Sequence, residues 1–225
     1  IERHKTFNRY INAKFKLLKN QSKGHFAFVK KEDQSINKEL KSKKLLSKII
    51  KVNTKKLNRF IKNINNQYFL SKTNKENLSF VFEILKKFKI NKNLFIRSIE
   101  NFKGLKYRQQ IIFKSKYLTI INDSKSTSFS SSVNVLEANQ NIFWLLGGIP
   151  KKGDKFDISR KYRPSIRAFI YGKNKKFFNK KLNGKIIFKN FDNLSDALKK
   201  IFTIIKKEKF KNKTILFSPC SASFD

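Results

Sequence analysis

The stretch Ile142-Phe143-Trp144-Leu145-Leu146-Gly147-Gly148-Ile149-Pro150-Lys151 decides the fold of this chain. Its first five residues form a short, continuous apolar run, and two glycines end that run abruptly. A strand that is apolar on both faces is typical of a parallel sheet covered by helices on both sides. The run therefore predicts a central strand of an α/β domain, with a polar loop at its carboxyl end.

Strand-like and helical patterns alternate on either side of this run. A hairpin is expected at 110–113 and 117–122, and an amphipathic helix at 194–207, where apolar residues recur every three or four positions. Strands separated by helices predict a Rossmann-like α/β domain with a mostly parallel sheet. Its further strands are expected at 168–171, 185–188 and 214–217.

The first hundred residues are richer in helical patterns. Helices are expected at 6–20, at 36–46, after a cap at Thr73 or Asn74, and through 94–99. The pattern breaks at Phe102-Lys103-Gly104, so we place a domain boundary between residues 103 and 104. Short strand-like runs lie at 25–30, 48–52 and 67–70.

The net charge of +38 suggests nucleic-acid binding, because a dense cationic surface attracts phosphate backbones. However, the lysines are spread along almost every segment, and Lys, Asn, Ile and Phe are all favoured by A/T-rich codons. The sequence shows no helix-turn-helix, RNA-recognition or zinc-finger pattern. We expect no specific nucleic-acid partner, and a basic nucleic-acid-binding module remains the alternative of another class.

Cysteine content and hydropathy bear on the compartment. A single cysteine, Cys220, excludes an internal disulfide and fits a reducing compartment. No apolar stretch approaches the roughly 18 residues that a membrane span needs. We expect a cytoplasmic monomer without membrane insertion. The chain begins at Ile1, contains no Met and stops after an apolar run, so we expect an internal fragment of a longer protein.

Three polar loops follow predicted strands. In an open α/β sheet, ligands collect at the carboxyl ends of the strands. Each loop alone has an ordinary reading as a helix cap, a tight turn or a loop start. Together, their hydroxyls, amides, carboxylate and lysines predict one site for a small, anionic ligand. The loops are 123–127, 147–151 and 218–224.

Other familiar signals are absent from the sequence or misleading. The glycine spacing from Gly148 to Asp154 resembles a phosphate-binding loop, but Asp154 stands where that loop has lysine. The two histidines, His4 and His25, lie far apart without partners at ligand spacing, so we expect no zinc site.

Five segments resemble the Mur ligase family, and most specifically its D-glutamate-adding members. Asp-Ser-Lys-Ser-Thr at 123–127 resembles D-S-K-A-T, and Ser-Pro-Cys-Ser-Ala-Ser-Phe-Asp at 218–225 resembles S-P-A-C-A-S-[FL]-D. Residues 104–108 resemble G-L-P-H-R, with Lys106 and Tyr107 in place of Pro-His. The remaining matches are 73–77 with H-N-x-x-N, and 1–14 with the D-H-L-D-R-H stretch and the Ala-Lys that carries a carbamylated lysine.

The resemblance implies part of a central ATPase domain at 1–103, followed by an amino-acid-binding domain at 104–225 that is truncated at its end. It implies ATP-dependent ligation of D-glutamate to UDP-N-acetylmuramoyl-L-alanine through an acyl phosphate, with Mg²⁺, in peptidoglycan synthesis. The family's N-terminal domain and P-loop would lie before Ile1, so we expect the 225 residues alone to lack ligase activity. A sibling Mur ligase or a folylpolyglutamate synthase remains the alternative within the family.

The resemblance also assigns residues to roles. Lys14, once carbamylated, is expected to bind Mg²⁺, and Lys14, Arg108 and Asp123 are the expected catalytic residues. The ATP-binding residues implied by the resemblance are Asn74, Asn77, Arg108, Asp123 and Lys125, and the D-glutamate-binding residues are Thr127, Lys151, Ser223 and Phe224.

Overall fold

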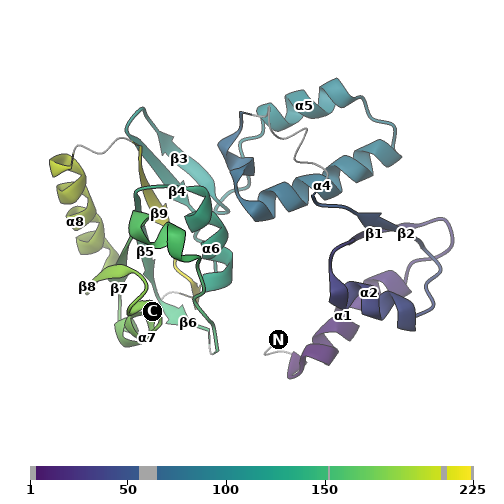
Figure 1. Ribbon diagram of the computed structural model, residues 1–225, viewed down its shortest axis with the longest axis horizontal. Helices are drawn as coiled ribbons and strands as arrows, with labels where there is room; N and C mark the ends of the chain where they lie inside the picture. The colour runs from purple at the N-terminus through teal and green to yellow at the C-terminus, as the bar shows by residue number, and fades with distance from the viewer. Residues whose placement is uncertain (1–3, 56–64, 152, 209–211, 224–225) are drawn as a thin grey trace. The chain divides into compact units, whose positions relative to one another are not determined.

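A computed structural model describes residues 4–55, 65–151, 153–208 and 212–223, and shows an α/β chain (Figure 1). The chain forms two compact units. Unit 1 comprises Ile1–Asn65 and Lys75–Glu100, and unit 2 comprises Asn66–Asn74 and Asn101–Asp225. The boundary placed from the sequence lies close to the division after Glu100. The assignment of the two domains to functions stays a prediction.

Unit 1 combines helices with a two-stranded parallel sheet, in which β1 (Phe26–Lys30) pairs with β2 (Lys48–Val52). Lys87 Nζ lies 4.1 Å from the centre of the Phe26 ring, and the Phe82 and Phe95 rings are 5.5 Å apart. The first contact joins a strand of the sheet to a helix, and the second joins two helices. Its helices are α1 (Phe7–Lys19), α2 (Gln34–Ser42), most of α4 (Lys72–Lys87) and α5 (Lys92–Glu100).

The expected helix at 36–46 was wrong at both ends. The helix α2 begins at Gln34 because the Asp33 side chain accepts a hydrogen bond from Ile36 N at 3.0 Å and so caps the first turn. It ends at Ser42, and the backbone of Lys43 is already extended.

Two expectations for the segment before α4 were also wrong. Residues 67–70 form the 3₁₀ helix η2 (Gln67–Leu70), because Asn66 Oδ1 accepts from Tyr68 N at 3.0 Å and starts a turn. The expected cap of α4 at Thr73 or Asn74 lies inside that helix. Ser71 takes this position instead, and its Oγ accepts from Asn74 N at 3.3 Å.

Unit 2 contains a six-stranded sheet in the order β3-β4-β9-β5-β7-β8. The pair β3–β4 is antiparallel, as expected for the hairpin, and all other neighbours are parallel. The last long strand, β9, therefore lies between β4 and β5. The strands are β3 (Gln110–Lys114), β4 (Leu118–Asn122), β5 (Ile142–Gly147), β7 (Ile166–Tyr171), β8 (Ile187–Phe191) and β9 (Lys213–Phe217).

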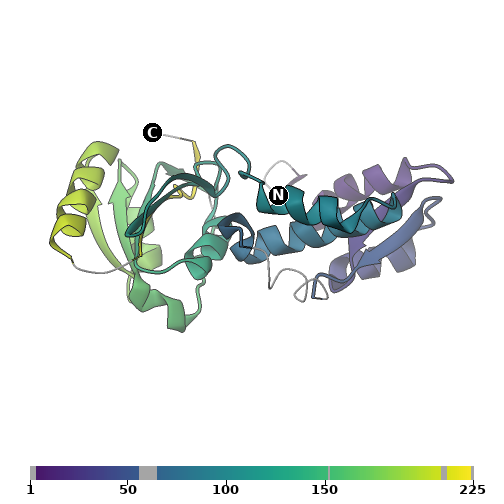
Figure 2. The same cartoon turned by 90° about the horizontal axis from the view of Figure 1, so that it is seen from above.

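Every residue of β5 is buried, as the run at 142–146 predicted. Trp144 packs with side chains from α6 (Phe129–Ala138) and α7 (Lys175–Leu182), and Phe143 packs with α8 (Leu194–Lys207) on the other face. Figures 1 and 2 show α6 and α8 on opposite faces of the sheet. The predicted α/β fold with a mostly parallel, two-sided sheet is confirmed.

The strand expected at 185–188 begins two residues later, at Ile187. The Leu182 carbonyl at the end of α7 accepts from Lys185 N at 2.9 Å and from Ile186 N at 3.0 Å, so these residues complete the helix end. Gly184 lies in the left-handed region at φ 68° and lets the chain reverse there.

We predict that Gly147→Ala destabilises unit 2 by about 1–3 kcal/mol, the usual range for overpacking. A Cβ at Gly147 would lie 2.3 Å from the Tyr171 carbonyl oxygen on the neighbouring strand. Urea unfolding followed by the fluorescence of Trp144, the chain's single tryptophan, measures the effect. The exposed change Ser195→Ala is the control, and an equal effect of both substitutions would contradict the prediction.

Candidate functional site

The carboxyl ends of three adjacent strands bring three loops together. In β9, Phe217 pairs with Asn122 of β4 and with Leu145 of β5. The loops that follow these strands therefore start side by side, with Asp123, Ser218 and Gly148 near their beginnings. The sequence predicted this convergence, and the structure confirms it.

Asp123 is the acidic centre of this edge. Its side chain is 6% exposed, Oδ1 accepts from Gln109 N at 3.0 Å, and Oδ2 accepts from Ser218 Oγ at 3.0 Å. Burial raises the pKa of this carboxyl to about 6, although the hydrogen bonds from Gln109 and Ser218 and the charge of Arg108 oppose the shift. Asp123 thus ties the β3–β4 hairpin to the loop after β9.

A buried network of hydroxyls continues from Asp123. Ser132 Oγ on α6 lies 2.5 Å from Ser218 Oγ, 2.8 Å from Ser126 Oγ and 2.9 Å from Cys220 Sγ. Burial raises the pKa of the Cys220 thiol well above its usual value, so the thiol remains protonated and can act as a weak donor. The network joins the loops after β4 and β9 through one helix.

Lys151 and Thr127, both expected in the amino-acid pocket, lie together. Lys151 Nζ donates to Thr127 Oγ1 at 3.1 Å. Lys151 is half-buried, and it forms no ion pair within the described residues. This edge of the sheet therefore offers a cationic group whose neighbour is a neutral hydroxyl.

The chain's last described strand runs beside this loop. In the antiparallel pair of β6 (Ile149–Pro150) and β10 (Ser221–Ser223), Ser223 lies opposite Ile149. The backbone of Ser223 therefore lies next to the segment that carries Lys151. Phe224, the fourth residue expected in the pocket, lies outside the described residues.

Arg108 and Lys125 come from two turns that touch. Arg108 N donates to the Leu105 carbonyl at 3.2 Å, and Lys125 N donates to the Tyr107 carbonyl at 3.1 Å. Tyr107 and Gln109 both have positive φ, at 65° and 50°, which non-glycine residues adopt at a cost of about 1–3 kcal/mol. Both basic side chains are exposed.

Asn74 is buried, and its side-chain amide is used inside unit 2. Nδ2 donates to the Tyr68 carbonyl at 2.6 Å and to Gln109 Oε1 at 2.9 Å. Asn77 is exposed on α4. The structure therefore gives Asn74 a direct connection to Gln109, and through it to Asp123.

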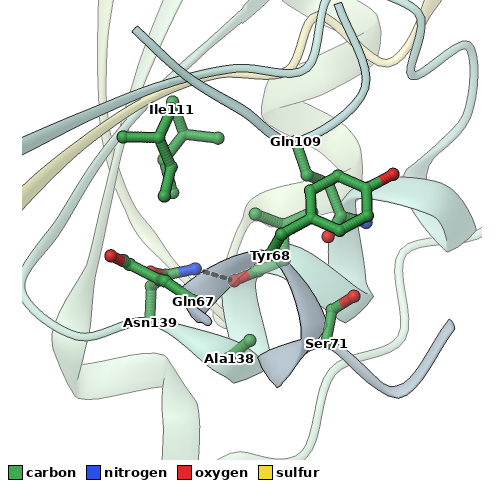
Figure 3. A pocket seen from close by; sticks show the side chains of 9 residues that line it. Gln67, Tyr68, Ser71, Gln109, Ile111, Ala138 and Asn139 are labelled. Carbon is green, nitrogen blue, oxygen red and sulfur yellow. Dashed lines mark hydrogen bonds between the residues drawn. The ribbon is translucent and has the colours of Figure 1, made fainter. Parts of the chain in front are cut away.

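Next to this connection lies a cavity of about 10 Å³, room for about one water molecule. Figure 3 shows side chains that line it, among them Gln67 next to Asn139, and Tyr68 next to Gln109. Gln67 Nε2 donates to Asn139 Oδ1 at 3.5 Å. The cavity is too small for a substrate. We therefore interpret its lining residues as structural support for the β3–β4 hairpin.

Lys14, the expected metal ligand, is exposed on α1, and its Nζ lies 5.6 Å from the centre of the Tyr10 ring. In the part of the chain that the structure describes, no group of three His, Cys, Asp or Glu side chains could hold a metal ion.

None of the described helices is both long and apolar enough to cross a bilayer.

Sequence reasoning missed three residues that organise the site, namely Gln109, Ser132 and Asp154. Gln109 and Ser132 act through contacts with partners distant in sequence, so no local pattern marks them. Asp154 was noted only as a departure from a phosphate-binding loop. It accepts a hydrogen bond from Phe129 N at 2.7 Å, at the start of α6.

Comparison with known proteins identifies the family. A UDP-N-acetylmuramoylalanine--D-glutamate ligase of Wolbachia sp. subsp. Brugia malayi is 32% identical over 153 residues, which cover 68% of this chain and 30% of that protein. The enzyme of the same name from Rickettsia bellii is 27% identical, and its match covers 100% of this chain and 54% of that protein. The chain belongs to the Mur ligase family.

A solved structure shows the same fold. A crystal structure of MurF from Acinetobacter baumannii matches 96% of this chain and 53% of its own, with a TM-score of 0.69 and 16% identity. No family model matches the chain. The chain spans about half the length of the Rickettsia Mur ligase that it matches throughout.

The raised pKa of Asp123 gives a prediction on stability. Since the neutral carboxyl is favoured in the folded protein, its contribution to stability is present below the unfolded pKa of 3.8 and is lost as the pH rises through about 6. Relative to Asp123→Asn, we expect the wild-type chain to lose about 2 kcal/mol between pH 4 and pH 8. Urea unfolding of both chains, followed by Trp144 fluorescence, measures this difference. Parallel pH profiles would contradict the predicted shift.

Proposed function

We propose that this chain is part of an ATP-dependent ligase that joins D-glutamate to UDP-N-acetylmuramoyl-L-alanine in peptidoglycan precursor synthesis. The observation that carries the proposal is the half-buried Lys151, held against Thr127 at the carboxyl edge of the sheet and without an ion-pair partner among the described residues. The name shared by the Wolbachia and Rickettsia relatives supports the same substrates.

The proposed reaction has two steps. The carboxylate of UDP-N-acetylmuramoyl-L-alanine attacks the γ-phosphorus of ATP, and ADP leaves. The amine of D-glutamate then attacks the acyl carbon of the resulting acyl phosphate, inorganic phosphate leaves with the electrons of the broken C–O bond, and the amine loses a proton. Several anionic groups meet in this reaction, so fixed positive charge around them lowers the barrier.

The D-glutamate pocket is proposed at Thr127, Lys151, Ser223 and Phe224. D-Glutamate carries two carboxylates, and Lys151 can neutralise one of them through a charge-assisted hydrogen bond. Hydroxyl and backbone amide groups of the other loops would hold the second carboxylate. The approach of β10 to β6 supports this grouping, since it brings the Ser223 backbone opposite Ile149.

The nucleotide residues are proposed at Asn74, Asn77, Arg108, Asp123 and Lys125, with residues 1–103 as part of the ATPase domain and 104–225 as the amino-acid-binding domain. Asn74 already uses both amide hydrogens inside unit 2, so Oδ1 is the group it would offer to ATP. Asp123 would act mainly by holding the turn that carries the exposed Arg108 side chain.

Magnesium is proposed as the cofactor together with ATP, and carbamylated Lys14 as one of its ligands. A carbamate would supply the oxygen atoms that Mg²⁺ prefers, whereas an unmodified ammonium cannot coordinate it. The described residues alone do not form a complete magnesium site. We also propose that the enzyme is cytoplasmic and monomeric. The proposed compartment is the one in which ATP and the UDP-linked substrate are found.

Substituting Lys151 tests the proposed pocket. In the full-length enzyme, Lys151→Ala should raise KM for D-glutamate about 10- to 100-fold, because it removes a charge-assisted hydrogen bond of about 1.5–3 kcal/mol. KM for ATP should change little. Steady-state ADP release at varied D-glutamate and ATP measures both values.

The matched control is Lys155→Ala, which removes an exposed lysine from the same loop region. It should leave both KM values near those of the wild type. A Lys151→Ala enzyme that kept its KM for D-glutamate and lost ATP affinity would assign Lys151 to the nucleotide site.

Substituting Lys14 tests the proposed metal ligand. In the full-length enzyme, Lys14→Ala should abolish turnover, and added acetate or formate should restore part of it by replacing the carbamate oxygens. The control is Lys16→Ala, an exposed change on the same helix, which should remain active. A Lys14→Ala enzyme with near-normal turnover would refute the assignment.

A further inference from the structure

Asp154 connects the loop that carries Lys151 to the first turn of α6. Its Oδ2 accepts from Phe129 N at 2.7 Å, across 25 positions in sequence. Ser128, the N-cap residue of α6, makes no side-chain bond to the backbone of the helix. Its hydroxyl instead contacts the hydroxyls of Ser130 and Ser131. Asp154 therefore supplies the capping acceptor that the local sequence does not.

The loop is also fixed on either side of Asp154. Asp154 N donates to the Lys151 carbonyl at 3.3 Å, and Gly153 adopts φ 78°, which permits a tight turn. Two residues further on, Phe156 is 2% exposed, and its ring centre lies 5.3 Å from that of Phe129. The hydrogen bond between Asp154 N and the Lys151 carbonyl thus keeps Lys151 near the start of α6.

The direction of the Asp154 carboxylate matters for the charge of Lys151. A carboxylate three residues away on the same turn is a ready partner for a lysine, but here it bonds to the helix start, where the partial charge is about +0.5. Among the described residues, Lys151 Nζ contacts Thr127 Oγ1 and no carboxylate. The lysine charge consequently stays available to a ligand.

We infer that Asp154 is a positioning residue for the amino-acid substrate: by capping α6, it holds Lys151 beside Thr127 and leaves the lysine charge for a substrate carboxylate. The inference rests on the proposed function. It adds that the anion-attracting start of α6 is occupied by the protein's own carboxylate, which directs the substrate carboxylate to Lys151.

The test uses the full-length enzyme with Asp154→Ala and Asp154→Asn, and ADP release at varied D-glutamate and ATP. Asp154→Ala should raise KM for D-glutamate about tenfold or more, a loss of about 1.4 kcal/mol, with KM for ATP within about twofold of the wild type. Asp154→Asn keeps an acceptor oxygen and should recover most of the loss. The control Asn193→Ala removes the cap of α8, where Asn193 Oδ1 accepts from Asp196 N at 2.9 Å, and should leave KM for D-glutamate unchanged.

A purely structural role would lower kcat through a smaller folded fraction and would leave both KM values unchanged, and that result would overturn the inference. If Asp154→Ala does not yield folded enzyme, Asp154→Glu replaces it, since the longer side chain keeps the charge but displaces the cap. An unchanged KM for D-glutamate in that variant would also overturn the inference. Failure of the wild-type enzyme to release ADP in response to D-glutamate would instead refute the proposed function.

Discussion

The pairing of β9 between β4 and β5 is the constraint on which the site depends. Parallel strands joined by backbone hydrogen bonds end at the same edge, so their following loops cannot separate without breaking the sheet. The register places Phe217 beside both Asn122 and Leu145, and the three loops leave from adjacent positions. Because β9 follows β4 and β5 in the sequence, the site is completed only when β9 has paired with these two earlier strands.

The loops themselves are held by polar contacts that would be weak in water but are buried here. Asp123, Ser218 and Ser132 form a continuous set of hydrogen bonds with few solvent-exposed atoms. An unpartnered polar group in such a place would cost about 1–3 kcal/mol, so each member constrains the next. The same burial raises the pKa of Asp123. The folded arrangement at this edge therefore keeps the Asp123 carboxyl buried, although burial disfavours its charged form.

The sequence predicted what depends on local pattern. The buried strand at 142–146 and the helix at 194–207 were correct because burial on both faces and a 3.6-residue period are visible in the residues themselves. The convergence of the three loops followed from the α/β class. Side-chain capping decided the errors at α2 and η2, where Asp33 and Asn66 started turns that the apolar pattern did not show. The contact of Asp154 with α6 could not be predicted, since it joins positions whose proximity exists only after folding.

The chain's single thiol lies inside this network, since Cys220 is 0% exposed and hydrogen-bonded to Ser132. Alkylating reagents attack the thiolate, which burial suppresses, so modification must wait until the segment after β9 opens. The labelling rate of Cys220 would then report how often this loop opens locally, as amide hydrogen exchange does for backbone groups. Ligands that hold these loops closed would slow the labelling of Cys220. Their occupancy could therefore be followed without any assay of turnover.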